Sequence, residues 1–127
     1  MATIHQETTF SAPPSRIYET LVDLQQFSAA TGAPATGDSA EGASFSAFGG
    51  YVTGRHVELV PGKLVVQAWR AKPWKEGHYS IVRFELVPEG KGTKLVFDHY
   101  GFPEDEREHL SNGWKAQYWE KIAKHLG

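Results

Sequence analysis

The last quarter of the chain, residues 103–126, constrains the fold most strongly because it has the pattern of one long amphipathic helix. Pro103 suits a first helical turn, since its φ is already helical and its missing N–H would have no partner there. Acidic residues follow it and basic residues lie near the other end, as the helix dipole favours. The apolar stripe contains Leu110, Trp114, Tyr118, Ile122 and Leu126, widened by Trp119 and Ala123. A face this broad and aromatic requires a broad apolar partner.

Alternating residues in the middle of the chain predict strands that can supply this partner. We expect a first strand over 3–10 and a hairpin of two strands over 51–60 and 63–69, turned by Pro-Gly. Two further strands are expected over 78–87 and 93–100. Together they predict an antiparallel sheet.

The last two predicted strands have distinct apolar and charged faces. Alternation places Phe84 with Val82 and Leu86, opposite Arg83 and Glu85. In the next strand the same rule groups Leu95, Phe97 and His99, opposite Lys94 and Asp98. We expect both apolar faces to turn toward the long helix.

Two short helices are expected between the first strand and the hairpin. Ser11 is a candidate cap for a helix reaching Val22, and a second helix is expected over 24–30, so that the two form a V. The order of strand, two helices, several antiparallel strands and one long helix predicts an α+β fold with a curved sheet of six or seven strands. Because no repeat or linker interrupts the pattern, we expect a single domain over 1–127.

The segment 29–50 has the weakest pattern. It is rich in Ala, Gly and Ser, with Phe45 and Phe48 as its large apolar residues. Short strands joined by mobile loops are expected here. The segment is either an ordinary surface region or a flap beside a cavity mouth.

Composition excludes several classes of function. The chain has 127 residues, a net charge of −2 and no basic stripe, so no nucleic-acid partner is expected. The absence of cysteine removes disulfides, thiol catalysis and cysteine-based zinc sites. The N-terminus lacks the pattern of a signal peptide and no apolar run approaches about 20 residues, so we expect a cytoplasmic protein without a membrane span.

No arrangement of residues indicates catalysis, a cofactor or a metal. There is no phosphate-binding glycine loop followed by Lys and Ser or Thr, and no serine nucleophile in a recognisable elbow. His78, His109 and His125 lack neighbours at metal-ligand spacing. Asp98 and His99 are adjacent in a strand and therefore face opposite ways. We predict no catalytic residue, no metal and no cofactor.

Motifs distributed along nearly the whole chain resemble a known family. They are Ala12-Pro13-Pro14-Ser15-Arg16-Ile17-Tyr18, Gly54, Glu58, Val60-Pro61-Gly62-Lys63, Gln67-Ala68-Trp69-Arg70, Trp74, His78-Tyr79-Ser80, Gly92-Thr93-Lys94-Leu95, His99, Pro103 and Gly113-Trp114. In this order they resemble the bacterial homologues of the activator of the heat-shock-protein-ninety ATPase, within the START-like superfamily. The resemblance implies the helix-grip fold of the birch-pollen allergen.

The resemblance also implies a cavity between the sheet and the long helix. The candidate ligand-binding residues are Trp69, Trp74, Phe84, Phe97, His99, Trp114 and Tyr118. The aromatic residues either line the cavity or fill the core. His99 could titrate near neutrality and hold a ligand's polar end, or be satisfied by a tyrosine or the backbone. Lys115 lies at the cavity mouth or extends into solvent.

Three functions remain open for such a chain. The favoured one is binding of a small apolar, aromatic or lipid-like ligand. The second is a protein–protein module that regulates a chaperone or another partner, or contacts a second copy of itself. The third, an enzyme of the cyclase or hydrolase kind, would require an acid or base in the cavity, for which His99 and a few tyrosines are the candidates.

Overall fold

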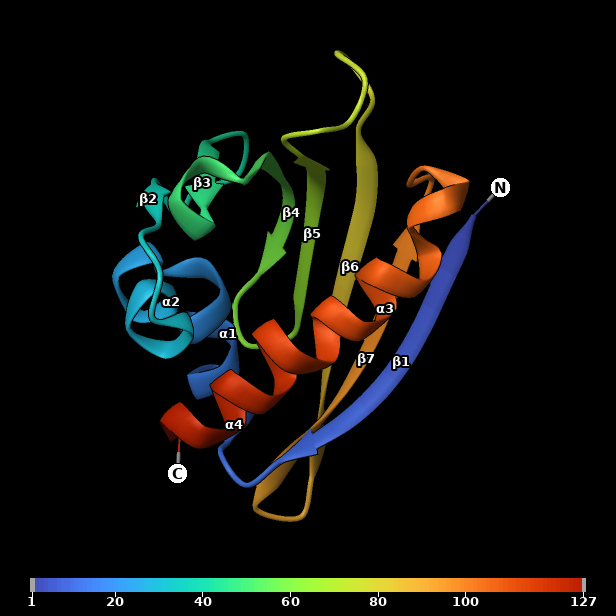
Figure 1. The fold of residues 1–127 in the computed structure, drawn as a ribbon. Helices are drawn as coiled ribbons and strands as arrows, with labels where there is room; N and C mark the ends of the chain where they lie inside the picture. The colour runs from blue at the N-terminus through green and yellow to red at the C-terminus, as the bar shows by residue number, and fades with distance from the viewer. Residues whose placement is uncertain (1, 127) are drawn as a thin grey trace.

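A curved sheet of seven antiparallel strands holds the C-terminal helix across one of its faces (Figure 1). The computed structural model describes residues 2–126. The spatial order of the strands is β1-β7-β6-β5-β4-β3-β2. In chain order they are β1 (Thr3–Phe10), β2 (Thr36–Gly37), β3 (Ser44–Ala47), β4 (Val52–Val60), β5 (Leu64–Ala71), β6 (Ser80–Glu89) and β7 (Gly92–Tyr100). The expected α+β arrangement is confirmed.

The first strand pairs with the last, so the chain must cross the sheet early. β1 runs antiparallel to β7, from Thr3 opposite Tyr100 to Phe10 opposite Thr93. The two short helices α1 (Pro14–Val22) and α2 (Leu24–Thr31) then carry the chain to the opposite edge, where β2 begins (Figure 1). Strands β3 to β7 follow as successive antiparallel neighbours. The helices therefore lie where the sheet would otherwise leave one end of the C-terminal helix uncovered.

Both short helices begin and end as their sequences dictate, with one correction. Ser11 is not the cap of α1, because Pro13 occupies the N-cap and makes no side-chain bond. Asp23 caps α2 by accepting a hydrogen bond from the backbone N–H of Gln25 at 3.0 Å. Gly32 ends α2 in the left-handed region, at φ 76°, where glycine carries no Cβ penalty.

The C-terminal helix, defined here as residues 104–126, contains a wide π turn. It consists of η2 (Glu104–Glu106), α3 (Arg107–Gly113), the π-helical η3 (Trp114–Trp119) and α4 (Glu120–Leu126). An α-helix has 3.6 residues per turn, so side chains spaced by four drift about 40° around the axis at each step. The π turn takes up an extra residue. It keeps Trp114, Tyr118 and Trp119 together on the buried face, whereas Ala123, predicted to widen that face, is exposed.

The predicted faces of the last strands are confirmed. Phe84 and Phe97 are almost fully buried, and their ring centroids lie 5.1 Å apart on the face that meets the helix. His99 is buried on the same face, whereas Asp98 lies on the outer face and contacts His5 at 2.7 Å. The strand expected over 78–87 begins two residues later, at Ser80, because His78 is in a turn and bonds the carbonyl of Gly101.

Polar contacts fix the C-terminal helix to the edge strand. The indole N–H of Trp119 donates to the side-chain oxygen of Gln6 at 2.6 Å, and the Gln6 amide donates to the Ser111 carbonyl at 3.0 Å. The helix is thereby held in register along β1. Within residues 2–126, no helix combines the length and the hydropathy that crossing a bilayer requires.

Candidate functional site

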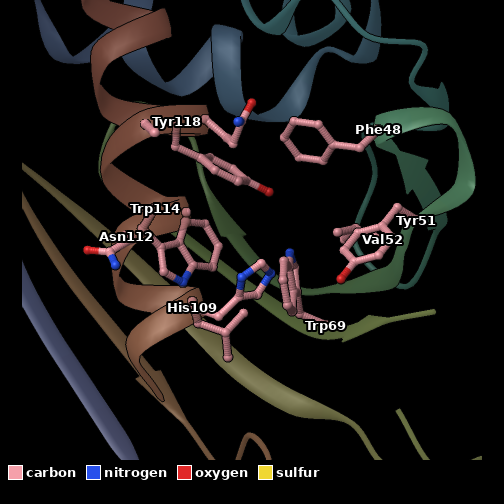
Figure 2. Close-up of a pocket in the computed structure, with 12 residues that line it drawn as sticks. Phe48, Tyr51, Val52, Trp69, His109, Asn112, Trp114 and Tyr118 are labelled. Carbon is pink, nitrogen blue, oxygen red and sulfur yellow. The ribbon is translucent and has the colours of Figure 1, made fainter. Parts of the chain in front are cut away.

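An open cavity of about 440 Å³ lies between the sheet and the C-terminal helix. Figure 2 shows side chains from both sides facing it: Trp114 and Tyr118 from the helix, and Trp69 from β5. Its lining comprises Phe48, Tyr51, Val52, Trp69, His109, Leu110, Asn112, Gly113, Trp114, Ala116, Gln117 and Tyr118. The volume lies within the range of about 300–1,000 Å³ typical of small-molecule sites, and most of the wall is apolar.

The segment that closes one side of the cavity has an unusual backbone. Phe48 has φ 53°, in the left-handed region that a residue with a Cβ rarely adopts, and Gly49 and Gly50 after it also have positive φ. This turn brings the Phe48 ring to 5.6 Å from Tyr118 and 5.8 Å from Phe27. Such backbone conformations concentrate at ligand-binding segments, where the surrounding structure compensates their cost.

Two polar groups face each other within the apolar wall. Burial raises the pKa of the Tyr118 phenol above its usual range, and the nearby Trp69 indole partly opposes this shift. The Trp69 N–H approaches the phenol without hydrogen-bond geometry, and within residues 2–126 it has no partner. A buried donor of this kind favours a ligand that carries an acceptor.

Next to the cavity the sheet–helix space is filled. The ring centroids of Trp114 and Phe97 lie 4.3 Å apart, and those of Trp114 and Phe84 lie 5.9 Å apart. His99 lies behind Trp114 with both ring nitrogens bonded. The Trp114 N–H donates to His99 Nδ1 at 3.0 Å, and His99 Nε2 lies 2.7 Å from the hydroxyl of Ser80. The part of the sheet–helix space that contains Trp114 and His99 therefore belongs to the packed core.

The bonding around His99 defines its tautomer. Because Nδ1 accepts from Trp114, the neutral ring carries its proton on Nε2 and donates it to Ser80. The Ser80 hydroxyl in turn donates to the carbonyl of Trp69 at 2.9 Å. Burial lowers the pKa of His99 to about 3. The prediction that His99 could titrate near neutrality is therefore wrong, because protonation would charge a dry, fully bonded ring.

The seven candidate ligand-binding residues fall into separate groups. Trp69, Trp114 and Tyr118 line the open cavity. Phe84 lines a much smaller inner cavity on the other side of Tyr118. The remaining three residues line neither cavity. Phe97 and His99 pack against Trp114, and Trp74 packs against Trp69 with ring centroids 5.6 Å apart. Lys115 is exposed and does not line the cavity.

Sequence reasoning missed much of the wall. Phe48 comes from the weakly patterned segment 29–50, for which a flap beside a cavity mouth was one of two interpretations, and Tyr51 and Val52 come from the start of the hairpin. The sequence pattern indicated no binding role for His109 and placed Gln117 on the solvent face of the helix, but both line the cavity. Among residues 2–126 no group of three or more His, Asp or Glu side chains is arranged to hold a metal ion.

The sequence matches the family model described as Activator of Hsp90 ATPase homolog 1-like protein over residues 11–127. The human Activator of 90 kDa heat shock protein ATPase homolog 1 is similar to it, with 33% identity over 119 residues. That alignment covers 94% of the present chain and 35% of the human protein. The chain thus spans about a third of the length of the curated relatives it matches.

Two solved structures have closely similar folds. An HSP90 activator from Plasmodium falciparum superimposes with a TM-score of 0.91 at 24% identity, over 100% of this chain and 97% of that one. An Aha1 dimer from Colwellia psychrerythraea gives a TM-score of 0.84 at 19% identity, over 100% of both chains. At these identities the likeness is one of fold, and it confirms the expected helix-grip arrangement.

Proposed function

This chain belongs to the family of Activator of Hsp90 ATPase homolog 1-like proteins, and from that premise we propose that it binds a small apolar or aromatic ligand between its sheet and its C-terminal helix. The observation that carries the proposal is the open cavity of about 440 Å³ with Trp69, Trp114 and Tyr118 in its wall. An aromatic wall with few polar groups removes an apolar ligand from water and leaves little polar surface unpaired.

A fluorescent probe tests this function directly. N-phenyl-1-naphthylamine is neutral and emits strongly only in apolar surroundings. It is expected to bind at about one site per chain with a Kd in the micromolar range. Ala116→Trp places a large ring at an exposed position of the wall and should weaken binding at least tenfold.

The matched control for this variant lies on the same helix. Ala123 is also exposed but does not line the cavity, so Ala123→Trp should leave the probe's Kd unchanged. The proposal is rejected if the probe stays dark with the folded wild-type protein at high concentration. It is also rejected if the two tryptophan variants weaken binding equally.

A second candidate function, contact with a chaperone, is favoured by family membership and by one surface. On the outer face of the sheet Ile81 pairs with Tyr100 across β6 and β7, and both are exposed. Tyr79, two residues before Ile81 in sequence, is 53% exposed, with the Arg70 guanidinium 5.8 Å from its ring centroid. Aromatic and Arg side chains are enriched at protein interfaces.

The ATPase rate of a purified Hsp90 chaperone provides the test of this second function. Addition of the wild-type chain should change the rate, and Ile81→Glu should abolish the effect while leaving probe binding intact. An effect lost in Ala116→Trp and retained in Ile81→Glu would instead place the contact at the cavity mouth. No change in rate at saturating concentration rejects the second function.

A further inference from the structure

A second, smaller cavity lies deeper in the molecule, on the far side of Tyr118 from the open one. Its volume is about 10 Å³, roughly the space of one water-sized group. The lining residues are Leu21, Leu24, Phe27, Phe45, Ala47, His56, Gln67, Phe84 and Tyr118. Tyr118 is common to both cavities, so a displacement of its side chain would join them into one chamber. The inner end of that chamber has two polar side chains in an otherwise apolar wall.

His56 is one of these polar groups, and its hydrogen-bonding capacity is unused. Its side chain is 1% exposed, and neither ring nitrogen has a hydrogen-bond partner within residues 2–126. Burial lowers the pKa of this imidazole, and the nearby backbone of Asp38 partly opposes the shift. The ring and the Asp38 backbone do not reach hydrogen-bond geometry. The ring is therefore neutral near pH 7, with one donor and one acceptor unused. A buried polar group without a partner destabilises the fold, so its presence requires an explanation.

The local backbone aims His56 into the chamber. Regular pairing with β5 from Val52 to His56 places the His56 side chain on the same inner face as Val52, and a β-bulge follows between His56 and Glu58, where Val57 is 52% exposed. Gly54 makes room for β5 and for the Phe45 ring, because a Cβ there would clash with the carbonyl oxygen of Ala68 and would lie 2.7 Å from the ring. The Phe45 ring in turn packs at 5.2 Å from the imidazole. Bulges are over-represented next to functional sites, and this one directly follows His56.

Gln67 is the second polar group and comes from the neighbouring strand. It is the direct cross-strand partner of His56 in the β4–β5 pairing and is 6% exposed. Both side chains line the inner cavity, and no charged residue does. A carboxylate or an ammonium placed there would be buried without a counter-charge, which is far more costly than burying a neutral polar group.

We propose that His56 and Gln67 form an inner polar subsite, reached past Tyr118, which binds a neutral hydroxyl group at the end of an otherwise apolar ligand. A hydroxyl both donates and accepts, so it can pair with one nitrogen of the imidazole in either tautomer and with the amide of Gln67. Its size suits a cavity of about 10 Å³, whereas the apolar body of the ligand would occupy the outer 440 Å³. The inference rests on the proposed ligand-binding function and specifies the class of ligand.

Two ligands of the same shape separate the subsite from the cavity as a whole. 2-Naphthol and 2-methylnaphthalene differ in a hydroxyl against a methyl group and are both neutral at pH 7. Their Kd values are measured by calorimetry, with the ligand in the cell because of its low solubility. His56→Leu should weaken 2-naphthol about five- to tenfold, the loss of one neutral hydrogen bond, and change 2-methylnaphthalene less than twofold.

Further variants keep the test decisive. Gln67→Leu removes the facing group and should act in the same direction. His125→Leu makes the same chemical change on the exposed face of the C-terminal helix and should alter neither Kd. The ligand-free His56→Leu protein should melt at the same or a higher temperature than wild type, because the substitution removes an unpaired buried group.

The outcomes separate the two proposals. If both ligands bind and His56→Leu weakens them equally or not at all, the inner subsite is rejected and the cavity function stands. If His56→Leu lowers the melting temperature by several degrees and leaves 2-naphthol binding unchanged, His56 is structural and the subsite is also rejected. If neither ligand binds the wild-type chain and the fluorescent probe stays dark, the ligand-binding function and the subsite fail together.

Discussion

Two buried histidines on the same sheet have opposite surroundings. Both face the interior, and burial lowers the pKa of both rings. His99 is bonded through both nitrogens, to Trp114 and to Ser80. His56 is bonded through neither within the described part of the chain. The first ring belongs to a closed network beneath the helix, and the second lies at the end of an unfilled space.

The difference shows how one interior can combine stability with binding capacity. Around His99 the aromatic rings of Trp114, Phe97 and Phe102 pack with their centroids 5.5, 6.2 and 4.9 Å from that of the imidazole, and the polar atoms satisfy one another. Around His56 the packing stops short and leaves hydrogen-bonding capacity unused. A fully satisfied network rigidifies a fold, whereas an unsatisfied group lowers stability until a partner arrives. The filled region therefore supports the region that is open.

The largest effect is expected from truncating Trp114, which packs against His99 in the filled region and also lines the open cavity. Trp114 is 2% exposed, and Trp114→Ala should lower the free energy of unfolding by about 3–5 kcal/mol, the usual range for deleting a buried large aromatic. Lys124→Ala, on the exposed face of the same helix, should change it by no more than about 0.5 kcal/mol. Urea denaturation of both variants provides the measurement. Equal, small effects would contradict the assignment of the filled region.

The next effect compares the two histidines themselves. His99→Leu leaves the buried Trp114 N–H and the Ser80 hydroxyl each without one partner, so it should cost about 2–4 kcal/mol. His56→Leu should cost nothing or stabilise the fold. Thermal or urea denaturation at pH 7 measures both. A loss from His56→Leu as large as that from His99→Leu would remove the distinction on which the comparison rests.

A smaller effect is expected from pH. The pKa of His99 is about 3 in the folded chain against an ordinary 6.5, so below pH 6.5 the unfolded state binds the extra proton. Stability contributed by this ring is complete above pH 6.5 and falls as pH decreases toward 3, by at most about 1.4 kcal/mol per pH unit. Urea denaturation at pH 7 and pH 5 should show a loss of roughly 2 kcal/mol that is absent in His99→Leu. An identical pH dependence in the variant would contradict the assignment.

The smallest effect expected is that of metal removal. No metal-binding cluster occurs within residues 2–126, so adding a chelator should leave the melting temperature unchanged. Differential scanning calorimetry with and without the chelator is sufficient. A reproducible drop of several degrees would reveal a structural ion that holds one of the two regions together.

Sequence patterns predicted the filled region better than the open one. The alternation that groups Phe84 with Phe97, and the helical spacing that adds Trp114, depend on regular periods and were confirmed by burial. The inner polar group was not found, because the bulge after His56 leaves Val57 and Glu58 both exposed and so obscures the alternation that places His56 inward with Val52. Phe48 was identified no further than as part of a possible flap, since its place in the wall depends on a left-handed backbone. A period describes regular elements, and this cavity is built where they are interrupted.

The π turn between Trp114 and Trp119 has a consequence for how this chain can change in length. The Glu120 N–H bonds the carbonyl of Lys115, five residues earlier, so the turn holds one residue more than an α-helix requires. Deleting Ala116 would let the helix continue in α geometry, and because the π turn had absorbed one residue, the later side chains would keep their angular phase relative to the sheet. A single deletion here would therefore remove one residue from the cavity wall and leave Trp119 and Ile122 on the buried face. Relatives with a shorter turn would present the same later side chains to the same sheet.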